Sequence, residues 1–202
     1  MAINSNRWTF LWNHTVSSVA GFSRLLITHP AFSFKLLMTR GAFFLTRKLQ
    51  KPLATPDGYL IESTEELVSY WGLFIEGECG TSEWKSDLKR ESRPLVLDVG
   101  ANAGLFSHLI WHLRPDAEFM VFEPLPKMGE KIAKWGKANK ANLTLYNQAV
   151  SDHCGTAIFY TSADNDTTAS LKPEGVKSTK LQVPIVTLDS VIPPPADFSH
   201  EN

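Results

Sequence analysis

The spacing of apolar residues predicts a helical segment at the start of the chain and a turn after it. In residues 8–49, Leu, Phe, Ile and Met recur at three- and four-residue spacings that are interrupted near His29 and Pro30. Because this period places apolar side chains on one face of a helix, we predict two helices. Residues 51–58 then contain two prolines and the dipeptide Asp57-Gly58, which predict a linker or turn.

A short strand and a helix are expected next. Residues 59–63 are typical of a short strand, and Thr64 is expected to cap a helix that extends to about residue 74. The Thr64 hydroxyl can accept from free backbone amides, while Glu65 and Glu66 suit the positive end of the helix dipole. Residues 76–92 are polar and indicate turns.

The central part of the chain alternates between strand and helix patterns. Residues 95–99 form a short apolar run entered through a proline, which is typical of a buried parallel strand. The pattern continues with a glycine-containing loop (100–104), a helix (105–113), a strand (118–123), a second helix (127–140) and a third strand (143–150). This order requires right-handed crossovers and a parallel sheet. We therefore predict an α/β fold, the first half of a doubly wound, Rossmann-like sheet.

Two further strand patterns follow. Residues 156–161 and 181–188 alternate or run apolar with β-branched residues, and the polar segment 162–179 separates them. They predict a β-hairpin insertion with a long loop. The chain is thus divided into a basic, helical N-terminal extension (residues 1–56), a lead-in strand and helix (57–92) and a partial cofactor-binding domain (93–202).

Charge distinguishes the N-terminal extension from the rest of the chain. The formal net charge is only −1, so the composition gives no reason to expect nucleic acid as a partner, because phosphate binding needs a concentrated excess of Lys and Arg. Residues 1–56 contain no Asp or Glu but carry seven Lys and Arg residues. Two interpretations stay open: these helices pack on the main domain with their cations in water, or they lie on an anionic membrane surface.

The cysteines and the apolar runs bear on the compartment. Cys79 and Cys154 are too few for a disulfide framework or a zinc cluster. No run of about 18 uninterrupted apolar residues is present, so no spanning helix is predicted. We expect a reducing, cytoplasmic location, with peripheral membrane contact through residues 1–56 as the alternative.

Candidate chemistry is concentrated in the loop after the first strand of the α/β pattern. Asp98 is the next-to-last residue of that strand, and the glycine loop, residues 100–104, follows with the sequence Gly-Ala-Asn-Ala-Gly. Gly100 and Gly104 allow the backbone to turn sharply and to approach a ligand closely, because neither carries a Cβ. The following helix offers free amides and a positive dipole end. The loop is therefore expected to bind a nucleotide-like cofactor.

The spacing of the glycines and a later acidic residue indicate which cofactor fits. A dinucleotide fingerprint has the form G-x-G-x-x-G, and Asn102 occupies the position of its second glycine. The observed form, Asp-x-Gly-x-x-x-Gly, is typical of S-adenosylmethionine sites. Glu123 ends the second strand, and an acidic residue about twenty residues beyond such a loop can accept hydrogen bonds from ribose hydroxyls. Alone, Glu123 would be a solvated strand-end charge; after this loop we expect it to bind the ribose.

These and later motifs resemble the FkbM family of S-adenosylmethionine-dependent methyltransferases. The matching segments are residues 95–104, 122–124, 147–152 with Gly155, and 186–189, together with Asp57-Gly58 and residues 63–66 in the lead-in. The resemblance covers roughly residues 56–192 and does not extend to residues 1–54. It is specific for the cofactor and says little about the substrate.

The resemblance implies a class I methyltransferase fold with the cofactor at the carboxyl ends of the strands. By that match the cofactor-binding residues are Asp98, Gly100, Ala101, Asn102 and Gly104 at the methionine part, Glu123 and Pro124 at the ribose, and Ala149 and Ser151 near the adenine. The implied reaction is methyl transfer to a hydroxyl of a sugar or other small metabolite. The catalytic base is not assigned; the candidates are Asp152, His153, Asp164 and Asp166.

The chain departs from the family after its Val-Thr-Leu-Asp segment, residues 186–189. The family continues with a central strand of the form Lys-Ile-Asp-x-x-Gly, so we expect this domain to be incomplete. That strand would lie beside residues 95–99, and we therefore expect an apolar sheet edge available for self-association or for a partner. Two alternatives stay open: a truncated, non-catalytic protein, and a nicotinamide-dependent oxidoreductase, which Asn102 disfavours.

No metal site is expected from the sequence. His108 and His112 are four residues apart on a predicted helix, so both could face an ion, but no carboxylate lies between them as in a metalloprotease helix. The triplet Asp164-Asn165-Asp166 resembles a calcium loop only superficially, because the later Gly and Glu of such a loop are absent.

Overall fold

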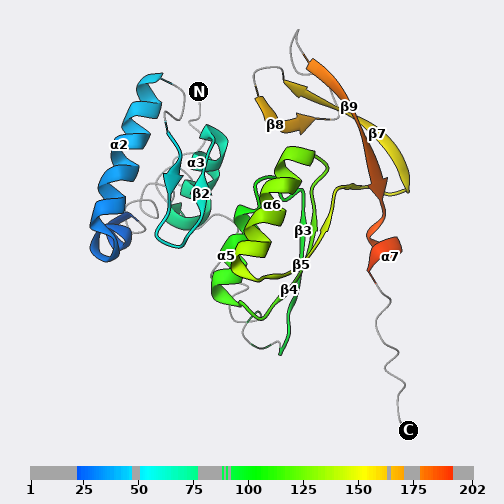
Figure 1. The fold of residues 1–202 in the computed structure, drawn as a ribbon, viewed down its shortest axis with the longest axis horizontal. Helices are drawn as coiled ribbons and strands as arrows, with labels where there is room; N and C mark the ends of the chain where they lie inside the picture. Colours follow the sequence, from blue (N-terminus) through cyan, green and yellow to red (C-terminus); the bar gives the residue numbers. More distant parts are fainter. Residues whose placement is uncertain are drawn as a thin grey trace, which may run out of the picture. The chain divides into compact units, whose positions relative to one another are not determined.

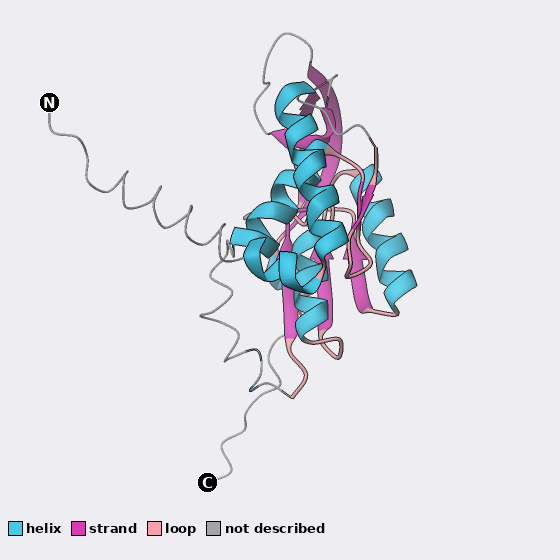
Figure 2. Cartoon of the chain, turned by 90° about the vertical axis from the view of Figure 1, so that its left-hand side faces the viewer, coloured by secondary structure: helices cyan, strands magenta, loops and turns pink. Residues whose placement is uncertain are grey.

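The structure is a computed structural model that contains two compact units. It describes residues 22–46, 51–76, 88, 90, 92–162, 165–170 and 178–192. Unit 1 comprises residues 1–92 and 108–114, and unit 2 comprises residues 93–107 and 115–202. The helices and strands of each unit are labelled in Figure 1 and distinguished by type in Figure 2.

The described part of unit 1 begins with two helical segments. Residues 22–28 are helical, and α2 (Pro30–Thr46) follows after His29. This confirms the predicted interruption, which occurs where Pro30 has no amide hydrogen to donate. The rest of the predicted helical region, residues 8–21 and 47–49, lies outside the described residues.

Large apolar side chains are exposed on both helical segments. They are Leu26, Ile27, Phe34, Leu37 and Met38. Among the described residues, no helix is long and apolar enough to cross a membrane. Peripheral membrane contact through this region stays a prediction.

A small hairpin follows the helices. β1 (Leu53–Ala54) pairs antiparallel with β2 (Leu60–Ile61), and Gly58 lies in the connecting turn with a φ of +83°. Glycine adopts this conformation without strain, so the predicted turn is confirmed. β1 was not predicted, because prolines flank it, and the strand predicted over residues 59–63 is only two residues long.

The next helix, α3 (Thr64–Tyr70), begins at a different cap from the one predicted. Ser63 is the N-cap residue, and its Oγ accepts a hydrogen bond from the Glu66 amide at 3.1 Å. The prediction of Thr64 as the cap is wrong, because the helix already includes Thr64 while Ser63 still has an extended backbone. A π-helix, η1 (Trp71–Glu76), continues from α3. Most of the polar segment that follows lies outside the described residues.

Unit 2 contains the parallel sheet predicted from the sequence. Its strands β3 (Leu95–Val99), β4 (Glu118–Phe122) and β5 (Asn142–Tyr146) are all parallel and lie in the order β3-β4-β5. The connecting helices are α5 (Leu105–Leu113), whose later residues belong to unit 1, and α6 (Pro126–Asn139). The mixed α/β class with a parallel sheet is therefore confirmed.

The central strand β4 is anchored by α6. Phe119 and Val121 of β4 and Ile132 of α6 have no exposed surface. Trp135 of α6 meets Phe119 edge to face, with the ring centroids 6.5 Å apart. Burial of a large apolar side chain contributes about 1.5 to 3 kcal/mol. The carboxyl end of β4 is therefore held in place by a packed core.

The outer strand β3 is buried on one face only. Val96 and Asp98 are buried, whereas Leu95, Leu97 and Val99 are 47%, 37% and 50% exposed. The expectation of a buried strand thus holds for alternate residues only, because successive side chains point to opposite faces of the sheet and one face of β3 is exposed. β3 is also the outer strand of the described three-stranded sheet. This is the apolar edge expected from the sequence, and its use in self-association stays a prediction.

A second sheet in unit 2 contains four strands in the order β6-β9-β7-β8. β7 (Gly155–Ser162) and β9 (Ser178–Val186) are antiparallel, which confirms the predicted hairpin-like pair. β8 (Asn165–Ser170) pairs with β7, so the interpretation of the intervening polar segment as a loop is wrong for these residues; residues 163–164 and 171–177 of that segment lie outside the described part of the chain. A one-turn helix, α7 (Leu188–Val191), follows β9.

The third predicted strand, residues 143–150, is divided between the two sheets. β5 ends at Tyr146, whose carbonyl oxygen accepts from the Glu123 amide at 3.0 Å. β6 (Ala149–Val150) pairs instead with β9. The prediction of one continuous strand is wrong: the polar pair Asn147 and Gln148 separates β5 from β6, and the hydrogen-bonding partner changes across it.

Candidate cofactor-binding site

The glycine loop joins the end of β3 to the start of α5 and is fixed to β4. The amides of Gly100 and Ala101 both donate to the carbonyl oxygen of Phe122, at 2.9 and 3.1 Å. Gly100, Asn102 and Gly104 have positive φ angles of +73°, +51° and +76°. Glycine adopts this region freely, and Asn is one of the few other residues that tolerate it. The residue types in the loop therefore suit its tight path.

The two glycines of the loop have different surroundings. A Cβ added at Gly100 would meet nothing within 4 Å, so the space beside it is open. A Cβ added at Gly104 would lie 3.0 Å from Cγ1 of Ile132 in α6. From the sequence we expected a ligand to need the space beside both glycines. That explanation suits Gly100, whereas Gly104 is needed for the close packing of the loop on α6.

Glu123 follows β4 and turns its carboxylate toward the glycine loop. Its Oε2 accepts from the Asn102 amide at 2.6 Å, and its Oε1 accepts from the Leu125 amide at 2.8 Å. Burial raises the pKa of Glu123, and the two backbone hydrogen bonds oppose that rise only in part. An ionised carboxylate has about four lone-pair sites, so Glu123 retains acceptor capacity for further hydroxyl groups.

Asp98 is a second buried acid at the same end of the sheet. It is 6% exposed, and the Ser107 hydroxyl donates to its Oδ2 at 2.5 Å. Burial raises the pKa of Asp98, although the hydrogen bonds from Ser107 act in the opposite direction. The charge of Asp98 also raises the pKa of Glu123. Both carboxylates are buried at the same end of the sheet, so a cation bound there would stabilise the ionised form of each.

Of the remaining predicted residues, two lie in the glycine loop or directly after Glu123, and two lie in or beside the second sheet. Ala101 is buried in the loop, and Pro124 is half-buried directly after Glu123. Ala149 belongs to β6, and Ser151 follows it and donates its amide to Val186 at 2.8 Å. The structure thus joins the glycine loop to Glu123 by a hydrogen bond and connects Ala149 and Ser151 to β9.

The candidate catalytic bases lie in different parts of the chain. Asp152 and His153 are exposed and form a pair, with Oδ1 of Asp152 2.6 Å from Nδ1 of His153. This hydrogen bond holds the pKa of Asp152 below its ordinary value. Asp166 lies in β8, and Asp164 lies outside the described residues. None of them is assigned as the base.

Two side-chain contacts, one made by Ser107 and one by Asp57, were not predicted from the sequence. The Ser107 hydroxyl donates to Asp98. The sequence contains a signal for this contact, because a hydroxyl stands in the first turn of a largely apolar helix, nine residues after the acid. Asp57 lies 3.3 Å from His108 in unit 1. No local spacing indicates that second contact, because the two residues are far apart in the sequence.

Comparison with protein-family models, curated proteins and solved structures gave no match to this chain. The similarity to FkbM-family methyltransferases therefore depends on the motifs quoted above.

Proposed function

We propose that this chain is an S-adenosylmethionine-dependent methyltransferase of class I fold that acts on a hydroxyl of a sugar or other small metabolite. The observation that carries the proposal is the 2.6 Å hydrogen bond between the Glu123 carboxylate and the Asn102 amide. Two motifs 21 residues apart meet there because parallel strands end at the same edge of the sheet. Open α/β sheets bind their ligands at that edge.

The charge at the site favours a cationic cofactor. Asp98 and Glu123 are both buried beside one loop, and each has a raised pKa because ionisation is costly there. A diphosphate would add negative charge to this pair, whereas a sulfonium and an α-ammonium group would compensate it. The two buried carboxylates therefore favour S-adenosylmethionine over a nicotinamide dinucleotide.

The residues also fit the shape and hydrogen bonding of that cofactor. The open space beside Gly100 suits close approach of a ligand to the backbone. Glu123 would accept hydrogen bonds from the ribose hydroxyls, and the loop with Asp98 would hold the methionine part. The substrate class is carried by the family resemblance alone, since a fold is a weak guide to the substrate.

In the proposed reaction the cofactor supplies the reactive group and the protein positions it. S-adenosylmethionine supplies a methyl group already activated by its sulfonium. The protein then contributes mainly by binding, by aligning the acceptor and by excluding water. Glu123 would have two roles: its carboxylate fixes the loop by accepting from the Asn102 and Leu125 amides, and it would also bind the ribose hydroxyls.

Ligand binding to the full chain tests the proposal. S-adenosylhomocysteine should raise the melting temperature and NAD should not, because only the ligand that binds the native state stabilises it. Glu123→Ala should weaken S-adenosylhomocysteine at least about tenfold, since charge-assisted hydrogen bonds contribute about 1.5 to 3 kcal/mol each. The affinities are measured by isothermal titration calorimetry.

Glu118→Gln is the matched control, because Glu118 is an exposed acid at the opposite end of the same strand. It should bind S-adenosylhomocysteine as the unsubstituted chain does. Gly100→Ala serves as a second variant if removal of Glu123 disturbs the loop. Failure of S-adenosylhomocysteine to bind, or unchanged affinity in both site variants, would refute the proposal; stabilisation by NAD alone would favour an oxidoreductase.

A further inference from the structure

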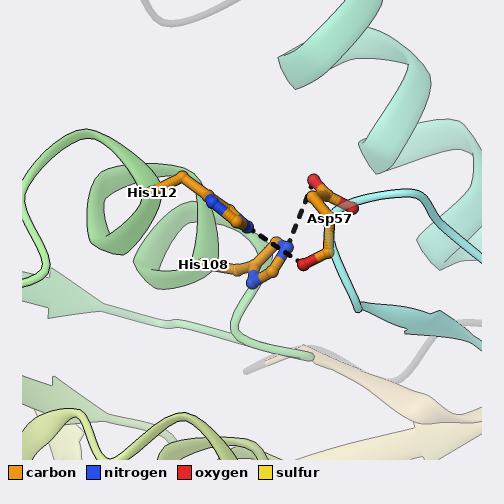
Figure 3. Close-up of side chains that lie close together, drawn as sticks. All are labelled: Asp57, His108 and His112. Carbon is orange, nitrogen blue, oxygen red and sulfur yellow. Dashed lines mark hydrogen bonds and ion pairs between the residues drawn. The ribbon is translucent and has the colours of Figure 1, made fainter. Parts of the chain in front are cut away.

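A second group of chemically active side chains lies in unit 1, apart from the residues used in the proposed function. Asp57 comes from the turn between β1 and β2, and His108 and His112 come from successive turns of α5. Figure 3 shows the three side chains directed toward one another. One ligand atom from each lies within 4.8 Å of the other two, and His108 Nε2 is 3.3 Å from Asp57 Oδ2.

The position of Asp57 is fixed by its turn. The Thr55 hydroxyl accepts from the Tyr59 amide at 2.9 Å and donates to the Tyr59 carbonyl oxygen at 3.0 Å. The single proton of this hydroxyl can be donated to Asp57 instead of to Tyr59, and the Gly58 amide donates to the Thr55 carbonyl oxygen at 3.1 Å. This network leaves the carboxylate little freedom before any ligand binds.

The histidines are held equally well. The His108 ring has no exposed surface and packs against the rings of Tyr59 and Phe74, with centroids 5.1 and 6.0 Å away. His112 meets His108 edge to face at 4.6 Å, and its Nε2 lies 3.0 Å from the Asp57 carbonyl oxygen. His112 is exposed, and these contacts keep its ring beside His108 and Asp57.

We propose that Asp57, His108 and His112 form a binding site for a divalent transition-metal ion, with zinc as the expected ion. Two imidazole nitrogens and one carboxylate oxygen are a ligand set that Zn²⁺ uses when a fourth position stays open. At metal–ligand distances of about 2.0 to 2.1 Å, tetrahedral ligands are about 3.3 Å apart. The His108–Asp57 separation already has this value.

Access and charge are suitable for an ion. Asp57 retains 20% of its side-chain exposure and lines a pocket of about 300 Å³ with Tyr70 and Phe74, so an ion can reach it from solvent. Asp57 is the acidic member of the cluster, and a carboxylate oxygen beside two imidazole nitrogens is a donor set that suits a divalent ion.

The competing explanation is a histidine–aspartate pair that only joins α5 to the hairpin within unit 1. Titration of the metal-free full chain with Co²⁺ and Zn²⁺ separates the two. We expect one equivalent of Co²⁺ to give visible d–d absorption, Zn²⁺ to displace it, and Zn²⁺ to raise the melting temperature of the unsubstituted chain.

Variants assign the site to its residues. His112→Ala and Asp57→Asn should each weaken the competing Zn²⁺ affinity at least tenfold. Both side chains have exposed surface, so these variants should fold more readily than a change at His108. His153→Ala is the control, because His153 is an exposed histidine outside the cluster, and it should bind Zn²⁺ normally.

Three results would overturn the proposal: no Co²⁺ absorption in the unsubstituted chain, Zn²⁺ affinity that neither site variant lowers, or an equal loss in His153→Ala. Glu123→Ala should leave Co²⁺ binding intact, because Glu123 takes no part in this cluster. Failure of the metal site is thereby distinguishable from failure of the proposed methyltransferase function.

Discussion

The two glycines of the glycine loop allow a matched pair of substitutions that separates backbone strain from packing. Gly100 and Gly104 have nearly equal positive φ angles, +73° and +76°. A Cβ is free of contacts at Gly100 but lies 3.0 Å from Cγ1 of Ile132 at Gly104. Alanine at either position therefore has the same backbone cost, and only Gly104→Ala adds a packing cost.

The magnitudes follow from these two contributions. A non-glycine residue in the left-handed region costs about 1 to 2 kcal/mol, and the stiffer unfolded chain offsets about 0.4 to 1 kcal/mol of that. Gly100→Ala should therefore lower the free energy of unfolding by about 1 kcal/mol. Overpacking against the fully buried Ile132 adds about 1 to 3 kcal/mol, so Gly104→Ala should lose about 2 to 4 kcal/mol in total.

Amide hydrogen exchange of β4 is the appropriate assay, because it reports the stability of unit 2 itself. Equal losses for the two variants would refute the packing argument. Cofactor binding should show the reverse order: Gly100→Ala places a methyl group in the open space and should weaken S-adenosylhomocysteine more than Gly104→Ala does. If Gly104→Ala weakened binding more, the open space beside Gly100 would not be where the ligand approaches.

Further predictions concern caps and buried acids. Ser63→Ala should lower the free energy of unfolding by about 1 kcal/mol in urea melts because the Glu66 amide loses its acceptor, whereas Thr64→Ala should change it little. Ser107→Ala should cost about 1 to 3 kcal/mol by the same measurement, because Asp98 loses a buried donor. Burial raises the folded-state pKa of Asp98 above its ordinary 3.8, so the folded state holds the proton more tightly. The contribution of this group to the free energy of unfolding should therefore fall as pH rises from 3.8 through the raised pKa. Asp98→Asn should remove that part of the pH dependence. Urea melts at a series of pH values measure both.

Local patterns in the sequence were sufficient for most elements of the parallel sheet. Residues 95–99 and 105–113 were predicted with the bounds of β3 and α5, because their periodicity is distinct and the glycines between them end one element and begin the next. The pairing of the loop with Glu123 was also predictable, since parallel strands bring their carboxyl ends to one edge of the sheet.

Pairing partners and long-range contacts were decided by the tertiary structure alone. The local sequence of residues 143–150 does not contain the information that β5 and β6 join different sheets. The cap at Ser63 rather than Thr64 depends on where helical backbone angles begin, and both residues carry the required hydroxyl.

The contrast is clearest at the two candidate sites. The sequence was sufficient to locate the motifs of the proposed cofactor site, because each lies within a few residues of a strand end and needs only local geometry. Asp57 and His112 are 55 residues apart, and their approach depends on how α5 packs against the hairpin of unit 1. Spacing along the chain specifies which side chains share one helix face, whereas a ligand drawn from another element is specified only by folding.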